Sequence, residues 1–207
     1  MRINNNVAAY NAYRSTNATN VALGKSLEKL SSGYRINRAG DDAAGLVISQ
    51  KLRAQLGGLR TAVRNVQDGV SVVQTAEGAL TEVHSMLNRM RDLAVQAANG
   101  GANDSSAIAT AQGELDQLVD EIDHIGGQTQ FAGISLLDGT YSGKLFQVSA
   151  EAGDVVTVNV ADMQAAALGI DALKNGGGSD LATNVADAIS VIDAAIASVS
   201  TTRGGLG

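Results

Sequence analysis

The longest hydrophobic pattern in the chain begins near Ala43 and ends near Ala98. Its apolar positions alternate steps of four and three residues, which is the heptad repeat of a coiled-coil helix. One three-residue step from Val73 to Ala76 interrupts the alternation and predicts a stammer, a local overwinding of the coil. Such a helix would be about 80 Å long. The predicted seam consists of Leu52, Leu56, Leu59, Val63, Val66, Val70, Val73, Ala76, Leu80, Val83, Leu87, Met90, Ala94 and Ala97.

A second helical pattern follows after a short polar link at residues 99–104. Asp104 or Ser105 can cap its start, and Gly126-Gly127 is predicted to end it. Because the link is short and contains glycine, we expect the two helices to pack as an antiparallel hairpin. The second helix would cover the far half of the long helix.

The pattern changes to strand-like alternation in the next part of the chain. Residues 145–148 and 155–160 alternate as two strands, with a hairpin loop at 150–154. Residues 134–137 predict a further short strand before Asp138-Gly139.

A last helix is predicted to start near Asp180, after a flexible link at residues 176–179. Its apolar stripe continues to the end of the sequence, and we expect it to cover the near half of the long helix. The fold class is therefore mainly α: an elongated antiparallel helical bundle or coiled coil with a small β-hairpin region.

Residues 1–38 also show helical spacing, most clearly at Leu23, Leu27 and Leu30. No other segment is left to pair with this stripe. A short amphipathic helix without a partner is not stable in water. We therefore expect the start of the chain to be disordered, or to be completed by another molecule.

Charge is divided unevenly along the chain. Residues 1–40 carry six Lys or Arg and one acid, a net charge of +5, whereas the remainder carries nine against twenty, a net charge of −11. The acid-poor start also fits a transit peptide, but the heptad pattern continues well beyond it. No apolar run is long enough to span a bilayer. The absence of Cys excludes disulfides and thiolate chemistry.

No catalytic, cofactor or metal site is predicted. His84 and His124 are the only histidines, and neither has a second ligand at metal-site spacing. Asp41 and Asp42 are adjacent, so on a helix they diverge instead of converging as an acid–base pair; we interpret them as a helix start. The basic stretch from Lys25 to Arg38 lacks a nucleic-acid-binding motif, and the overall pI is acidic.

Four stretches resemble one known family. They are "MRINNNVAAYNAYR", "LSSGYRINRAGDDAAGLVISQKLRAQLGGL", "LNRMRDLAVQAANG" and "EIDHIGGQTQFAGISLLDG". In this order they are similar to bacterial flagellin, the subunit of the flagellar filament. The resemblance is close over residues 1–140 and looser over 180–207. Tyr34 departs from the family, which often has Leu there.

The resemblance implies a domain organisation. Residues 1–42 would form an inner-core polymerisation and export segment, in which Leu23, Leu27 and Leu30 make polymer contacts. A spoke joint at about residues 31–42 would include Arg35, Asn37, Asp41 and Asp42. Residues 43–180 would form the outer-core helical rod with β-hairpins, and 181–207 the incomplete start of a returning C-terminal helix.

The resemblance also implies partners. These are other flagellin subunits in a homopolymer, the flagellar export apparatus and chaperone, and the filament cap and junction proteins. A contact with the vertebrate toll-like flagellin receptor would involve Arg89, Leu93 and Glu114. The chain would be secreted to the extracellular flagellum and have no cofactor, no nucleic acid and no membrane insertion.

Two alternatives remain at this point. A hook–filament junction-type axial protein shares the style of the N-terminal motif, although "RDLAVQAANG" and "GQTQF" favour flagellin. An enzyme is the other alternative, but the chain has no room for a catalytic insertion and no His-Glu-x-x-His motif.

Overall fold

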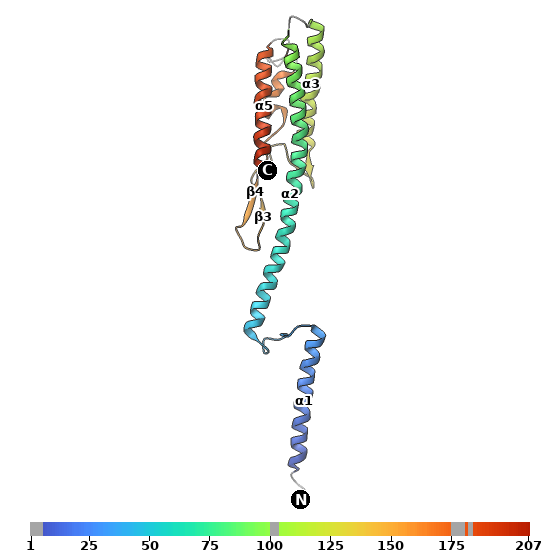
Figure 1. Ribbon diagram of the computed structural model, residues 1–207, viewed down its shortest axis with the longest axis vertical. Coiled ribbons are helices and arrows are strands. Elements are labelled where there is room, and N and C mark those ends of the chain that lie inside the picture. The colour runs from blue at the N-terminus through green and yellow to red at the C-terminus, as the bar shows by residue number, and fades with distance from the viewer. Residues whose placement is uncertain (1–5, 100–103, 175–180, 182–183) are drawn as a thin grey trace. The chain divides into compact units, whose positions relative to one another are not determined.

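A computed structural model describes residues 6–99, 104–174, 181 and 184–207 (Figure 1). The chain forms two units, residues 1–58 and 59–207, and the boundary between them lies within one long helix. The predicted glycine-rich link at 176–179 and the predicted helix start at Asp180 lie outside the described residues.

Helix α1, Val7–Ser32, is the first element of unit 1. The Asn6 side chain caps its start by accepting a hydrogen bond from the N–H of Ala9 at 3.1 Å. Gly33 ends it with φ 71°, a left-handed conformation that glycine adopts without steric cost, and donates to the Lys29 carbonyl. The helical spacing of the N-terminal segment therefore does correspond to a helix.

Helix α2, Ala43–Ala97, is a single helix of 55 residues and confirms the long helix predicted from the heptads. The chain contains no proline, so no backbone N–H along this length is missing and no ring forces a kink. Asp42 supplies its N-terminal cap, since the Asp42 carboxylate accepts a hydrogen bond from the N–H of Gly45 at 2.9 Å.

Helices α3, Ser105–Gln128, and α5, Val185–Leu206, lie beside α2 in unit 2 (Figure 1). The Arg89–Glu114 ion pair joins α2 to α3. Two further pairs join α2 to α5 in antiparallel order, Arg91–Asp193 at 2.7 Å and Arg203–Glu77 at 3.5 Å. Both helices therefore cover the far half of α2. The prediction that the last helix covers the near half is wrong, because α5 turns back onto the same half as α3.

The buried stripe of α2 differs in phase from the predicted seam over its first part. It passes from Val72 through Ala76 to Leu80 in two steps of four residues, which is a stutter and not the predicted stammer. Before Ala76 the covered positions are Ala62, Gly69 and Val72, one residue away from the predicted Val63, Val70 and Val73. From Ala76 onward every predicted seam position is buried, and Leu93 is buried in addition.

Gly126 continues α3 and does not end it as predicted. The helix runs through Gly126-Gly127 to Gln128. A Cβ built on Gly126 would lie 3.1 Å from Cγ of Gln164 and 3.4 Å from its Cα. This glycine is therefore needed for the close approach of the segment around Gln164.

Two antiparallel hairpins follow α3. Strands β1, Gln130–Phe131, and β2, Ile134–Ser135, are joined by Ala132 and Gly133, both at positive φ as a type I′ turn requires. Strands β3, Lys144–Gln147, and β4, Val155–Val158, form the second hairpin, in which Phe146 pairs with Val156. The three predicted strands are confirmed as β2, β3 and β4: β2 and β4 are two residues shorter than predicted, and β3 is shifted by one residue. Strand β1 was not predicted.

Sequence patterns missed the compact segment between the second hairpin and α5. It contains the one-turn helix α4, Ala165–Leu168, and the 3₁₀ helix η1, Ile170–Leu173. The N–H of Ala165 donates to the Asp123 carboxylate of α3 at 2.7 Å. The core of unit 2 combines this segment with all three long helices, and its largest fully buried side chains are Leu80, Leu87, Met90, Leu115, Ile122, Leu136, Leu137, Met163, Ile170, Leu173, Leu181 and Ile192.

Helix α5 is, within the described residues, the one helix long and apolar enough to cross a membrane by length and composition. Its Ile192 and Val199 are fully buried in the core of unit 2. Its buried residues, Ala188, Ile192, Ala195 and Val199, recur at helical spacing, and 22% of its apolar window is buried.

Candidate assembly surface

Unit 1 has no buried side chain among its described residues. The predicted polymer contacts Leu23 and Leu27 are each 56% exposed, and Leu30 is 81% exposed. Most of the stability of a helix in a protein comes from packing of its amphipathic face, and an uncovered leucine stripe costs hydrophobic free energy. The exposed stripe is therefore the feature of unit 1 that needs an explanation.

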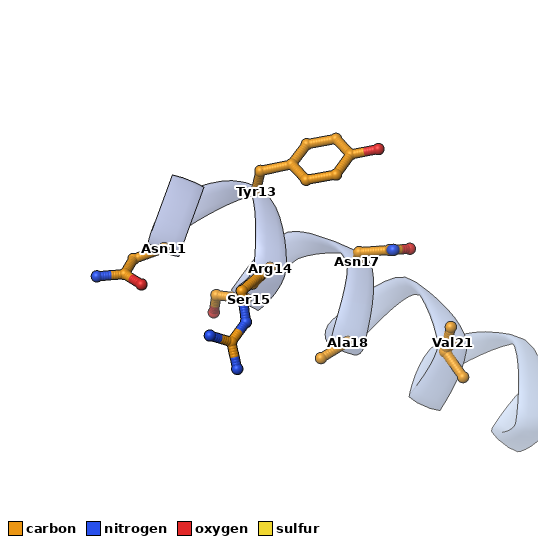
Figure 2. Close-up of a pocket in the computed structure, with 7 residues that line it drawn as sticks. All are labelled: Asn11, Tyr13, Arg14, Ser15, Asn17, Ala18 and Val21. Carbon is orange, nitrogen blue, oxygen red and sulfur yellow. The ribbon is translucent and has the colours of Figure 1, made fainter. Parts of the chain in front are cut away.

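The first turns of α1 illustrate how little surrounds this helix. Figure 2 shows a shallow hollow whose lining residues all belong to α1. Tyr13 and Arg14 project away from the helix, and no second element contributes to the lining. A hollow built from one helix does not enclose a small molecule, so we do not interpret it as a ligand site.

The uncovered surface also includes the first half of the α2 seam. Leu52, Leu56, Leu59, Val63, Val66 and Val70 are between 40% and 58% exposed. The predicted seam from Leu52 to Ala97 is therefore buried only in its second half. Within unit 2, the seam residues Val66, Val70 and Val73 line an apolar groove of about 290 Å³, together with Phe146 and Leu206.

The spoke segment is ordered by contacts with the last turns of α1. The Asn37 amide donates to the Ser32 hydroxyl at 2.8 Å and to the Glu28 carbonyl at 3.4 Å. The Arg38 guanidinium donates to the Glu28 carboxylate at 2.9 Å. Glu28 therefore accepts hydrogen bonds from two spoke residues, a role that was not predicted from the sequence. The signal that could have indicated it is that Glu28 is the single acid in residues 1–40.

The other predicted spoke residues lie around the start of α2. Arg35, Asp41 and Asp42 line one shallow depression with Lys29 and Ile36. The N–H of Asp41 donates to the Arg38 carbonyl at 3.0 Å, which closes a turn immediately before the helix cap. The four spoke residues therefore lie in one short segment but have different contacts.

Tyr34 provides a contact that sequence reasoning did not predict. The Arg53 guanidinium carbon lies 4.4 Å from the centroid of the Tyr34 ring, within cation–π distance. This contact links the spoke to the second and third turns of α2. A leucine at position 34 would lack the electrostatic part of this interaction.

Replacing Asp42 with Ala should destabilise the first turn of α2 by about 1 kcal/mol, because the N–H of Gly45 loses its capping acceptor. Amide hydrogen exchange of residues 43–47 measures the effect. Asp41→Ala is the matched control, since Gly45 bonds to Asp42 and not to its neighbour. Equal acceleration of exchange in both variants would contradict the assignment of Asp42 as the cap.

The three residues predicted to contact an immune receptor occupy different environments. Arg89 and Glu114 are exposed and form an ion pair at 2.7 Å between α2 and α3. Leu93 is 2% exposed and lies in the core. A partner approaching this face would therefore meet Arg89 and Glu114, with Leu93 packed beneath the surface.

The described part of the chain contains no group of three or more His, Asp or Glu residues arranged to hold a metal ion. His124 is exposed and lies 4.0 Å from Glu121, the next acid on the same helix face. The features that stand out are uncovered apolar helical faces and a capped joint between helices. Uncovered apolar faces of this kind are typical of surfaces that other molecules cover.

Comparison with known proteins identifies the family. Residues 3–142 match the family model described as the bacterial flagellin N-terminal helical region. Over its whole length the chain is 46% identical to a flagellin of Bacillus subtilis strain 168 and covers 78% of that protein. It is 47% identical, again over the whole chain, to a flagellin of Halalkalibacterium halodurans and covers 75% of it.

A solved structure agrees with this relationship. The crystal structure of Bacillus cereus flagellin matches with a TM-score of 0.60 and 37% sequence identity, over 70% of this chain and 81% of that one. The chain belongs to the bacterial flagellin family. It is a structural subunit of the bacterial flagellar filament, and its family is structural and non-enzymatic.

Proposed function

We propose that the chain joins the filament through the apolar helical faces that its own fold leaves uncovered. These faces are the Leu23–Leu27–Leu30 stripe of α1 and the first half of the α2 seam. The observation that carries the proposal is that unit 1 has no buried side chain among its described residues, although it presents a row of leucines. Each leucine covered by a neighbouring subunit would contribute about 1.5–3 kcal/mol.

The spoke would act as an adjustable joint between the polymerising segment and the rest of the subunit. Asn37 is held by Ser32 and Glu28 on α1, whereas Asp42 caps α2. Arg35 and Asp41 lie between these fixed points. Because Asn37 is anchored on α1 and Asp42 on α2, the backbone between these two residues can change its angles while both sets of hydrogen bonds stay intact.

The proposal also covers export of the chain and its contact with an immune receptor. Residues 1–42 also carry the export signal, and the export apparatus, chaperone, cap and junction proteins handle the chain on its way to the extracellular filament. The chain has no catalytic activity of its own. The toll-like flagellin receptor would read the exposed Arg89–Glu114 pair, with Leu93 supporting the helix from within.

Hydrogen exchange on dilute monomer and on assembled polymer tests the proposal. Amides of α1 should exchange nearly unprotected in the monomer and at least about 100-fold more slowly in the polymer, because neighbours then cover the leucine stripe. Amides of residues 76–94 provide the internal control, since this stretch is buried within unit 2 and should be protected in both states.

A pair of matched variants sharpens this test. Leu23→Gln with Leu27→Gln should abolish assembly, whereas Asn11→Gln with Asn17→Gln on the same helix should leave it unchanged. Strong protection of α1 in the dilute monomer, or normal assembly of the leucine variant, would overturn the proposal.

A further inference from the structure

We infer that the spoke carries a latch that fastens it along the first turns of α2 and holds the joint in one conformation. The inference rests on the proposed role of the spoke as a joint, and adds to it the residues that restrain the joint. All of them lie in unit 1. The latch consists of two spoke residues and the two α2 residues that they contact: Tyr34, Ile36, Gly45 and Arg53.

The first contact of the latch is that of Ile36 with Gly45. A Cβ built on Gly45 would lie 2.9 Å from Cδ1 of Ile36, so any side chain at position 45 would displace the isoleucine. Ile36 is half-buried, whereas the leucines of α1 are exposed. The N–H of Gly45 also donates to the Asp42 carboxylate. Gly45 therefore both seats Ile36 and binds the cap of α2.

The second contact of the latch is that of Tyr34 with Arg53. The guanidinium carbon lies 4.4 Å from the centroid of the ring. Arg53 follows Gly45 by eight residues, which is about 12 Å along the helix. Residues 34–36 therefore lie along the side of α2 and not only at its end. An exposed cation–π contact changes an equilibrium constant only about two- to fivefold, so the latch can open by thermal motion.

The anchors on α1 follow immediately in the chain. The Asn37 amide donates to the Ser32 hydroxyl at 2.8 Å, and Arg38 donates to a carboxylate of the same helix. Residues 34–36 lie between α1 and these anchors, so they move with α1 when the backbone between Asn37 and Asp42 changes its angles. Such a movement withdraws Tyr34 from α2. The joint can therefore flex only when the latch is open.

Replacing Tyr34 tests whether the two contacts of the latch open together. In NMR of the dilute monomer, a nuclear Overhauser effect joins the δ1 methyl protons of Ile36 to the α protons of Gly45. Tyr34→Leu should weaken this signal, because the ratio of latched to open spoke falls about two- to fivefold. Tyr34→Phe keeps the ring and should keep the signal. Tyr13→Leu is the matched control, since Tyr13 is an exposed tyrosine on α1.

Filling the seat of Ile36 tests the same coupling from the other end, because coupling between two contacts is reciprocal. Gly45→Ala should reduce the ring-current shift that Tyr34 causes in the side-chain protons of Arg53. Gly57→Ala is the matched control on the same helix, since a Cβ there meets no atom within 4 Å. Asp42→Ala removes the cap without filling the seat and should reduce the shift less.

Three results would overturn the latch while leaving the proposed polymerisation intact. They are an unchanged Ile36–Gly45 signal in Tyr34→Leu, an unchanged Arg53 shift in Gly45→Ala, and an equal loss of that shift in Asp42→Ala. Circular dichroism checks that each variant is folded. If the original chain failed to polymerise but the monomer signals responded as expected, the proposed function would fail and the latch would stand.

Discussion

Replacing Leu87 with Ala should lower the free energy of unfolding of unit 2 by about 3–5 kcal/mol. The Leu87 side chain is fully buried in the core, so truncation removes buried apolar groups and leaves a cavity. The same replacement at Leu56, on the same helix but about half exposed, should change the stability of the monomer by less than about 0.5 kcal/mol.

Urea unfolding of dilute monomer, followed by circular dichroism, measures both changes. The slope of the free energy against urea concentration should stay the same, which shows that stability and not denatured-state compactness has changed. Similar losses at Leu87 and Leu56 would mean that the first half of α2 is covered within the monomer, contrary to the exposed seam described above.

Replacing Gln112 with Leu should lower the free energy of unfolding by about 3 kcal/mol, even though the volume is nearly conserved. Gln112 is 5% exposed, and its amide donates to the Leu173 carbonyl and the Asp116 carboxylate. Its carbonyl oxygen accepts from the N–H of Leu181 at 2.8 Å. The substitution leaves buried backbone groups without partners, at about 1–3 kcal/mol each.

Gln117→Leu is the matched control for this prediction, because it makes the same chemical change at an exposed position of the same helix. Hydrogen exchange should also show faster exchange of the Leu181 amide in the Gln112 variant alone. A neutral Gln112→Leu variant would show that water replaces these hydrogen bonds, and that Gln112 does not fix Leu173 and Leu181 onto α3.

Strong periodicity made the long helices predictable. The start of α2 followed from a capping aspartate before a sustained heptad pattern, and the start of α3 from Asp104, which does accept a hydrogen bond from the N–H of Ala107. The end of α3 was predicted too early because Gly126 looked like a cap. Its actual role is a close approach to Gln164, a tertiary contact that the sequence does not reveal.

The phase error on α2 has a related cause. Between Ala43 and Ala76 the helix has apolar residues on more than one side, and the most periodic set of them predicts a seam that differs from the buried one. The structure buries Ala62, Gly69 and Val72 instead. A Cβ on Gly69 would lie 3.2 Å from the Phe146 ring of β3, so a glycine at this position allows the β3–β4 hairpin to approach. The large side chains of the predicted seam are left exposed.

Short elements and side-chain contacts were beyond sequence reasoning. α4 and η1 together span too few residues to show a period, and buried hydrogen bonds from α3 fix them. The leucines of α1 and the spoke residues could be selected from spacing and family resemblance. The contacts of Asn37 and Arg38 with Glu28, and of Tyr34 with Arg53, could not be predicted, because only the folded chain brings these residues together.

The described part of unit 1 contains no buried side chain, and this has a mechanical consequence. A pull on α1 would have to break the backbone hydrogen bonds of single helical turns, one after another, and the few exposed contacts that the spoke makes with Glu28, Ser32 and Arg53. Substantial resistance would begin where α2 becomes tightly packed, near Val72. The leading end can thus be unwound at low force and threaded through a narrow opening before the packed remainder yields.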